Sequence, residues 1–199
     1  MEKSLTKILN GYRQFRENYK NLTLMPSKLG ADQKPEIMIV SCCDSRVDPA
    51  IIFECDPGDL FVIRNIASLI PPYEKDEFHH GTSAALEFGI KILNVKHLII
   101  LGHSNCGGIE NIRQNCDKKN DFISNWLSIL NSKNFNNLPL EDCIKTALTQ
   151  SYDNCLTFPW IQEKIQSGEL EIHTWFFDLK TGILNQYDKN TRKYVAISL

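Results

Sequence analysis

The sequence predicts an α/β fold with a central, mostly parallel β-sheet flanked by helices, an antiparallel edge strand and an N-terminal helical arm. Short apolar runs alternate with longer segments of helical periodicity, which is the pattern of a parallel sheet with crossover helices. A turn at 180–182 between two late strand-like segments indicates the antiparallel edge. The length of 199 residues suits one domain. We therefore expect a single domain over 1–199, with residues 1–30 as the arm and residues 31–199 as the α/β core.

Each element follows from a local pattern. Residues 1–25 carry apolar side chains at helical spacing with lysine and arginine between them, which predicts one or two amphipathic helices. Apolar or alternating runs bounded by turn residues predict five strands. The expected strands are 36–42, 59–65, 96–102, 170–179 and 183–188. The expected helical segments are a turn at 49–54 begun by Pro49, a helix at 79–94 capped by Thr82 or Ser83, and a mostly helical stretch at 107–166 with breaks near 118–121 and 131–138.

Composition excludes several classes of partner. A formal net charge of −2 gives no electrostatic reason to expect nucleic acid or an anionic membrane. No apolar run approaches the roughly 20 residues that span a bilayer, and the charged N-terminus does not resemble a secretory signal. The seven cysteines are an odd number, which favours free or metal-bound thiols in a reducing compartment. We expect a cytoplasmic protein without a nucleic-acid or membrane partner.

Two polar clusters follow predicted strands at their carboxyl ends. The first is "SCCDSRVDP" at 41–49, and the second is "GHSNCGG" at 102–108. Because ligands of open α/β sheets bind where parallel strands end, the two clusters are expected to share one site.

The residue types of these clusters are those of a zinc site. In extended chain Cys42, Asp44 and Arg46 share one side, whereas Cys43 points away. His103 and Cys106 are three residues apart in a glycine-rich turn and can aim at one point. Two thiolates and one imidazole leave a fourth zinc position open, which is the catalytic rather than the structural pattern.

Other interpretations of these residues fit less well. The "GHSNC" stretch resembles a serine nucleophile elbow, but its fifth residue is Cys106 instead of glycine. No Gly-Lys-Ser/Thr follows the glycine-rich run, so it is not a phosphate loop. The Cys42-Cys43 pair lacks the usual C-x-x-C redox spacing. An inert buried cluster would not explain why five such residues gather at strand ends.

The order and spacing of "CCDSRVDP" and "GHSNCGG" resemble the β-class carbonic anhydrases, in a plant-type member with an open site. The resemblance extends through "PGDLFVIRNIASLIPPY" at 57–73 and "GTSAALEFGIKILNVKHLIILGHSNCGG" at 81–108. It implies a zinc lyase with one Zn²⁺ per chain, held by Cys42, His103 and Cys106. The implied reaction is the reversible hydration of CO₂ to bicarbonate and a proton through zinc-bound hydroxide.

The resemblance also implies roles for the two charged residues of the first cluster. Asp44 would accept a hydrogen from the zinc-bound water, and Arg46 would hold Asp44 ionised through a bidentate pair. In some members of the family the aspartate occupies the fourth zinc position in an inactive state, and pairing with the arginine releases it. Asp44 and Arg46 are the expected catalytic residues.

The remaining site residues are expected from the resemblance alone. Gln33 would hydrogen-bond the substrate, often from a neighbouring subunit, and Phe61 and Ile66 would line an apolar CO₂ pocket. Gly107 and Gly108 would let the backbone approach the site. The resemblance further implies a homodimer or a dimer-based tetramer or octamer, with N-terminal helices reaching across.

The sequence departs from the family pattern at three positions. Phe88 stands where plant-type members carry tyrosine, so a hydroxyl role there is lost. A subset of bacterial members has an inhibitory bicarbonate site of tryptophan, arginine and tyrosine. Arg64 is present here, but Ile39 and Phe177 stand at the other two positions, so we expect no such site.

Two alternatives remain beside CO₂ hydration. One is a related hydrolase of CS₂ or COS that uses the same metal site. The other is a catalytically silent zinc-binding scaffold, against which the Asp44 and Arg46 pair argues. His79 and His80 precede the predicted helix at 79–94 and are interpreted as helix-capping or surface residues rather than as a proton shuttle. His97 and His173 are interpreted as structural residues.

Overall fold

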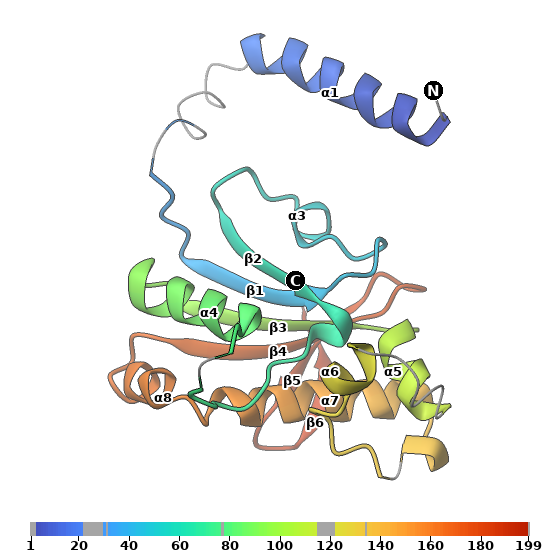
Figure 1. Ribbon diagram of the computed structural model, residues 1–199, viewed down its shortest axis with the longest axis vertical. Helices are drawn as coiled ribbons and strands as arrows, with labels where there is room; N and C mark the ends of the chain where they lie inside the picture. Colours follow the sequence, from blue (N-terminus) through green and yellow to red (C-terminus); the bar gives the residue numbers. More distant parts are fainter. Residues whose placement is uncertain are drawn as a thin grey trace.

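A six-stranded sheet forms the centre of the molecule in the computed structural model of Figure 1, which describes residues 3–21, 30, 32–76, 78–114, 122–133 and 135–198. The strand order is β2-β1-β3-β4-β5-β6. The first four of these strands pair in parallel, and the last two add an antiparallel edge. The strands are β1 (Ile37–Cys42), β2 (Leu60–Asn65), β3 (His97–His103), β4 (Glu171–Phe177), β5 (Leu184–Asp188) and β6 (Lys193–Ala196).

The predicted fold class is confirmed, with one addition at the edge. All five expected strands are present, and each begins and ends within two residues of its predicted limits. The additional strand is β6, which pairs with β5. Its four residues are mostly exposed, so the short "KYVA" segment carries no buried pattern that would have indicated a strand.

The two faces of the sheet are covered unequally. Alternate residues of β1 and β3 face the larger core, among them Met38, Val40, Leu98 and Ile100. The opposite face carries a small cluster of Ile39, Ile99 and Leu101, with Phe53 and Trp175 among the partly buried side chains packed against it. The helices therefore bury one face of the sheet much more fully than the other.

The helical segments follow the predicted order with altered limits. They are α1 (Lys3–Asn21), α3 (Pro49–Ile52), the 3₁₀ turn η1 (Ile66–Ser68), α4 (Gly81–Glu87), the π-helical η2 (Phe88–Ile92), α5 (Gly107–Arg113), α6 (Ile123–Leu127), η3 (Phe135–Asn137), α7 (Leu140–Cys155) and α8 (Pro159–Gln166). Helices α4, α5, α7 and α8 lie next to the sheet (Figure 1). The expected break at 131–138 contains η3, whereas 118–121 lies outside the described residues.

The expected cap of the 79–94 helix is wrong. Helix α4 begins at Gly81 with His80 as its N-cap residue, which makes no side-chain capping bond. Thr82 lies inside the first turn, and its hydroxyl accepts a hydrogen bond from Asn65 Nδ2 at 3.3 Å. The polar side chain that suggested a cap therefore ties the helix to the end of β2.

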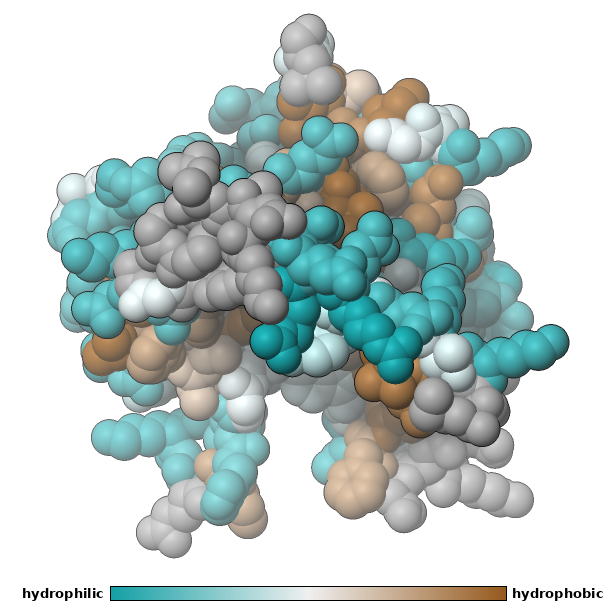
Figure 2. Space-filling view, turned by 90° about the horizontal axis from the view of Figure 1, so that it is seen from above, coloured by the Kyte–Doolittle hydropathy of each residue, from teal (hydrophilic) through white to brown (hydrophobic). Residues whose placement is uncertain are grey.

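The predicted N-terminal helix is present as α1, which lies apart from the sheet beyond β2 (Figure 1). Its apolar side chains are exposed in the single chain, at 37–69% of their full area. They are Leu5, Ile8, Leu9, Tyr12 and Phe15. Figure 2 views the molecule from this side, where hydrophobic side chains stand between hydrophilic ones. No helix in the described part of the chain has the length and apolar character that crossing a membrane requires.

Candidate metal centre

The predicted ligands meet where β1 and β3 end. Cys42 is the last residue of β1, His103 is the last residue of β3, and Cys106 lies directly before α5. The Cys42 and Cys106 sulfurs are 3.9 Å apart. One ligand atom from each of the three residues lies within 4.8 Å of the others, and all three side chains are buried. The sheet therefore brings two sulfurs and one imidazole to a single point.

The imidazole of His103 is held with one nitrogen available for a ligand. Its Nδ1 lies 2.9 Å from the Ser104 carbonyl oxygen, which can only accept, so Nδ1 carries the proton. Nε2 is then the atom with a free lone pair. It is buried and has no hydrogen-bond partner within the described residues. Because an unpaired buried polar atom is costly, this orphaned nitrogen fits a metal ligand.

The two thiols lie within hydrogen-bond reach of each other, and this contact shifts their pKa values in opposite directions. A hydrogen bond from the Cys106 thiol lowers the pKa of Cys42, while the same bond, together with burial, raises the pKa of Cys106. Backbone amides of Asp44 and Ala67 further favour the Cys42 thiolate, and those of Gly108 and Ile109 favour the Cys106 thiolate. Two buried thiolates and a neutral imidazole are the donor set of a zinc ion.

Asp44 lies beside these ligands in a bidentate pair with Arg46. Arg46 Nε and Nη2 donate to Asp44 Oδ1 and Oδ2 at 2.9 and 2.7 Å, and the Arg46 amide donates to Oδ1 at 3.0 Å. These hydrogen bonds hold the pKa of the Asp44 carboxyl well below its usual range. Asp44 Oδ2 lies 3.9 Å from His103 Nε2. The site therefore combines a fixed, ionised acceptor with the three candidate metal ligands.

Arg64 braces the loop that follows β1. Its guanidinium donates to the Cys42 carbonyl at 3.0 Å, the Asp44 carbonyl at 2.6 Å and the Asp48 carboxylate at 2.9 Å. Asp48 in turn accepts the Ala50 amide at the start of α3. Sequence reasoning considered Arg64 only for a bicarbonate site, because no local signal shows that an arginine on β2 bonds a neighbouring strand's loop.

Ser104 anchors the second loop. Its hydroxyl donates to Asp178 Oδ1 at 3.1 Å and accepts the Leu179 amide at 2.9 Å. The carbonyl of Asn105 accepts a longer bond from Arg46 Nη2 at 3.3 Å. The serine that resembled a nucleophile thus ties the β3–α5 loop to the end of β4.

Ile66 and Gly108 lie together on the α5 side of the site. A Cβ added at Gly108 would stand 2.8 Å from Ile66 Cγ2 and 3.2 Å from Ala67 Cβ, so η1 and α5 pack closely there. Trp126 Nε1 donates to the Ile66 carbonyl at 2.9 Å, a long-range contact that the sequence did not indicate. A Cβ at Gly107 would meet nothing within 4 Å. Of the two glycines, only Gly108 is required by packing.

Gln33 and Phe61 lie away from the candidate metal ligands of their own chain. Gln33 is exposed and precedes β1, whereas Cys42 ends it, and a six-residue strand spans about 20 Å. Phe61 is paired with Met38, four residues before the level of Cys42, and its ring stacks on Phe88 at 5.9 Å. Within one chain the described geometry does not bring these two residues to the cluster.

Known proteins share this sequence and fold. The sequence model of the carbonic anhydrase family matches residues 37–184. Beta carbonic anhydrase 3 of Arabidopsis thaliana is 31% identical over 98% of this chain and 81% of that protein. The solved structure of the β-carbonic anhydrase CcaA covers 98% of this chain and all (100%) of its own, with a TM-score of 0.89 and 28% identity. A tetrameric β-carbonic anhydrase of Sordaria macrospora covers 99% of this chain and 100% of its own, with a TM-score of 0.80 and 26% identity. The chain therefore belongs to the β-class carbonic anhydrases, the enzymes that interconvert carbon dioxide and bicarbonate.

Proposed function

We propose that this chain hydrates CO₂ with one Zn²⁺ held by Cys42 Sγ, His103 Nε2 and Cys106 Sγ. The observation that carries the proposal is the buried, unpartnered Nε2 of His103 beside two cysteine sulfurs that lie 3.9 Å apart. When bound, zinc supplies Lewis acidity that lets a water ionise near neutral pH. Three protein ligands leave a position for that water.

Asp44 is proposed as the group that orients the reacting water. Its carboxylate is ionised, lies 3.9 Å from His103 Nε2 and can only accept hydrogen bonds. A water that donates one hydrogen to Asp44 is held with a lone pair free to attack CO₂. Arg46 keeps this carboxylate in one orientation through two hydrogen bonds, and so keeps it from taking a metal position itself.

The substrate is proposed to enter over Ile66, beside the close contact of η1 with α5. CO₂ has no net dipole, so an apolar wall binds it without a desolvation cost. Gly107 and Gly108 belong to the proposed substrate site as the first residues of α5. Gly108 allows the close approach of Ile66, and Gly107 leaves open space next to the ligand Cys106.

A second copy of the chain is proposed to complete the site. The exposed apolar side chains of α1 favour a homodimer, or a tetramer or octamer of dimers, in which α1 packs on the neighbour. In such a dimer Gln33 and Phe61 would serve the partner's site, which agrees with their distance from their own ligands. The tetrameric Sordaria macrospora structures support an assembly of this kind.

Two further expectations remain proposals. The single catalytic domain is proposed to span 1–199, with 1–30 as its arm, and the family match within 37–184 supports its core. A cytoplasmic location is proposed because Cys42 and Cys106 serve as metal ligands only while they are kept reduced.

Stopped-flow CO₂ hydration against pH, with zinc measured on the same sample, tests the proposed function. We expect one zinc per chain and a rate that rises on the alkaline side of neutrality. Two thiolates neutralise the charge of zinc, so the ion acidifies its water less than it would with three imidazole ligands. A protein with one zinc and no turnover at high pH, or with turnover that survives complete zinc removal, would overturn the proposal.

A further inference from the structure

The geometry points to a second metal site, which we propose binds Zn²⁺ through His97 Nδ1, Glu171 Oε2 and His173 Nε2. Within the described residues, this trio and the catalytic cluster are the two groups whose ligating atoms converge closely enough to hold an ion. No step of CO₂ hydration uses it. His97 begins β3, whereas His103 ends it, so the two sites are separated by about 20 Å along the strand.

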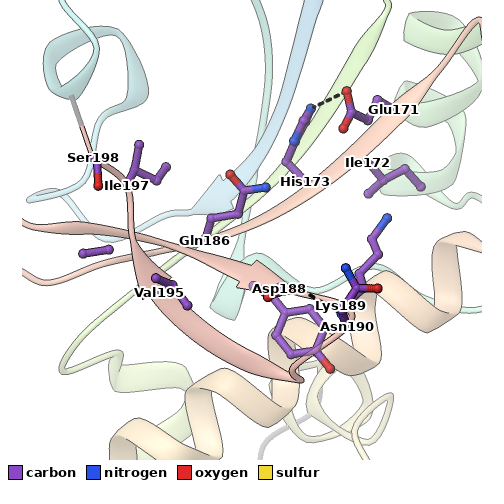
Figure 3. A pocket seen from close by; sticks show the side chains of 12 residues that line it. Glu171, Ile172, His173, Gln186, Asp188, Lys189, Asn190, Val195, Ile197 and Ser198 are labelled. Carbon is purple, nitrogen blue, oxygen red and sulfur yellow. Dashed lines mark hydrogen bonds and ion pairs between the residues drawn. The ribbon is translucent and has the colours of Figure 1, made fainter.

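Strand register creates the trio. His97 of β3 is paired with Glu171 of the parallel strand β4, and His173 lies two residues further along β4. Residues two apart in a strand point to the same face, so Glu171 and His173 flank one side of the sheet with His97 beside them. Figure 3 shows Glu171 and His173 turned toward each other at the rim of a surface groove. Backbone pairing alone therefore holds three ligands from two strands in one place.

The distances match those around a zinc ion. His97 Nδ1 lies 3.2 Å from His173 Nε2, and Glu171 Oε2 lies 3.8 and 3.7 Å from these two nitrogens. The point equidistant from the corners of this triangle is about 2.1 Å from each atom, which equals the usual Zn–N and Zn–O lengths. An ion slightly above the plane of the three atoms needs only a small inward shift of the exposed Glu171 side chain.

The chemistry of the donors selects the kind of ion. Two imidazoles and one carboxylate suit borderline divalent transition metals such as zinc, whereas Ca²⁺ and Mg²⁺ favour sites made of oxygen atoms. The side chains of His173, His97 and Glu171 are 15%, 43% and 65% exposed, so an ion can reach them from solvent.

Nearby lysines do not compete for the carboxylate. Among the described residues, Glu171 forms ion pairs with the two histidines and with no lysine or arginine. Lys96 is paired with Glu36, and Lys164 with Glu169. Lys189 lines the same groove as His173, and its ammonium lies 4.7 Å from the centre of the Tyr152 ring. The carboxylate is thus free to serve a metal, with the groove open for a water as fourth ligand.

Metal binding to the zinc-loaded enzyme tests this site. We expect isothermal titration calorimetry and metal analysis to find a second Zn²⁺ per chain in the wild type. Glu171→Gln should weaken the second zinc by about tenfold or more, and His173→Gln should abolish it. The control His79→Gln removes an exposed histidine elsewhere and should bind like the wild type. CO₂ hydration should stay unchanged in all three variants.

A spectroscopic readout distinguishes the two sites. Co²⁺ added to the zinc-loaded wild type should give d–d absorption without a thiolate-to-metal charge-transfer band, because the second site has no sulfur ligand. This absorption should be lost in His173→Gln and kept in His79→Gln. If His173→Gln fails to fold, the exposed Glu171→Gln carries the test alone. A wild type that takes up one zinc only, or equal second-site affinity in wild type and Glu171→Gln, would reduce the trio to a hydrogen-bonded histidine pair.

Discussion

Strand β3 carries a histidine at each end, and the two histidines differ in their burial and in the donor atoms beside them. His103 is 1% exposed and faces two sulfurs, whereas His97 is 43% exposed and faces a nitrogen and a carboxylate. The first cluster lies where parallel strands end and two loops and a helix N-terminus converge. The second lies where the strands begin, on the thinly covered face. The comparison shows that the proposed catalytic centre depends on burial and on the loops and helix around it, and not on a histidine at a strand end alone.

The carboxylates of the two clusters sharpen this contrast. Asp44 is held by Arg46 through two side-chain hydrogen bonds, beside the candidate ligands of the first cluster. Within the described part of the chain, Glu171 is paired with no arginine, and it faces the imidazoles directly. A carboxylate bound to arginine suits the orientation of a water, and one without such a partner suits binding of the ion itself.

Removing the Cys106 sulfur should give the largest loss of CO₂ hydration, because only the first cluster uses sulfur to hold a metal. We expect Cys106→Ala to lower CO₂ hydration by about 10³-fold or more, because the zinc that activates water would no longer be held. Metal analysis at limiting zinc should show loss of the catalytic ion. The exposed Cys43→Ser is the matched control and should keep both zinc and rate. Full activity in Cys106→Ala would remove Cys106 from the ligand set.

Neutralising each carboxylate in turn should have opposite effects on the rate of CO₂ hydration and on the second zinc. We expect Asp44→Asn to lower the rate of hydration by about 10²-fold while catalytic zinc stays bound, because the amide cannot serve as an ionised acceptor. Glu171→Gln should keep the rate. Stopped-flow assays with zinc analysis on both proteins measure this, and Asp153→Asn on the exposed surface of α7 is the control. Loss of catalytic zinc in Asp44→Asn would assign the carboxylate to the metal instead.

The sequence predicted the buried cluster because its signals are local. Cys42 and His103 each end an apolar run, and Cys106 follows within one turn. Because the carboxyl ends of parallel strands meet at one edge of a sheet, these three residues are expected to lie close together. His97 and His173 are 76 residues apart, and their contact depends on the β3–β4 register, which no local pattern specifies. They were therefore interpreted as separate structural residues.

The same limit explains the other residues that sequence reasoning missed. Arg64 and Trp126 act through bonds to distant backbone carbonyls, which leave no periodic trace in the sequence. Five of the six strands could be predicted to within two residues because their apolar runs record burial, whereas the mostly exposed β6 has no such run. The helix cap at Thr82 was mispredicted because a hydroxyl near a helix start can serve either a cap or a tertiary contact.

The close packing of α5 on η1 at Gly108 supports the first cluster and should contribute to the free energy of unfolding. We expect Gly108→Ala to destabilise the fold by about 1–3 kcal/mol, because its Cβ would meet Ile66 and Ala67 at 2.8 and 3.2 Å. Gly107→Ala is the matched control in the same helix turn, where a Cβ meets nothing within 4 Å. Urea unfolding of the two variants should differ clearly. Equal midpoints would show that η1 moves aside without cost.

The smallest expected effect concerns the pH dependence of the Asp44–Arg46 pair. Arg46 depresses the pKa of Asp44 in the folded protein, so the pair stabilises the fold fully above the unfolded-state pKa of about 4 and loses that contribution as pH falls toward the depressed value. Because Arg46 is 54% exposed, we expect Arg46→Gln to lower the free energy of unfolding only slightly at pH 7, with a smaller difference from wild type near pH 2. Urea unfolding of the chelator-treated proteins measures this, with Arg16→Gln on α1 as the control. A difference that stays constant with pH would mean that Arg46 acts through packing of the loop, and the contrast between the two carboxylates would then rest on Glu171 alone.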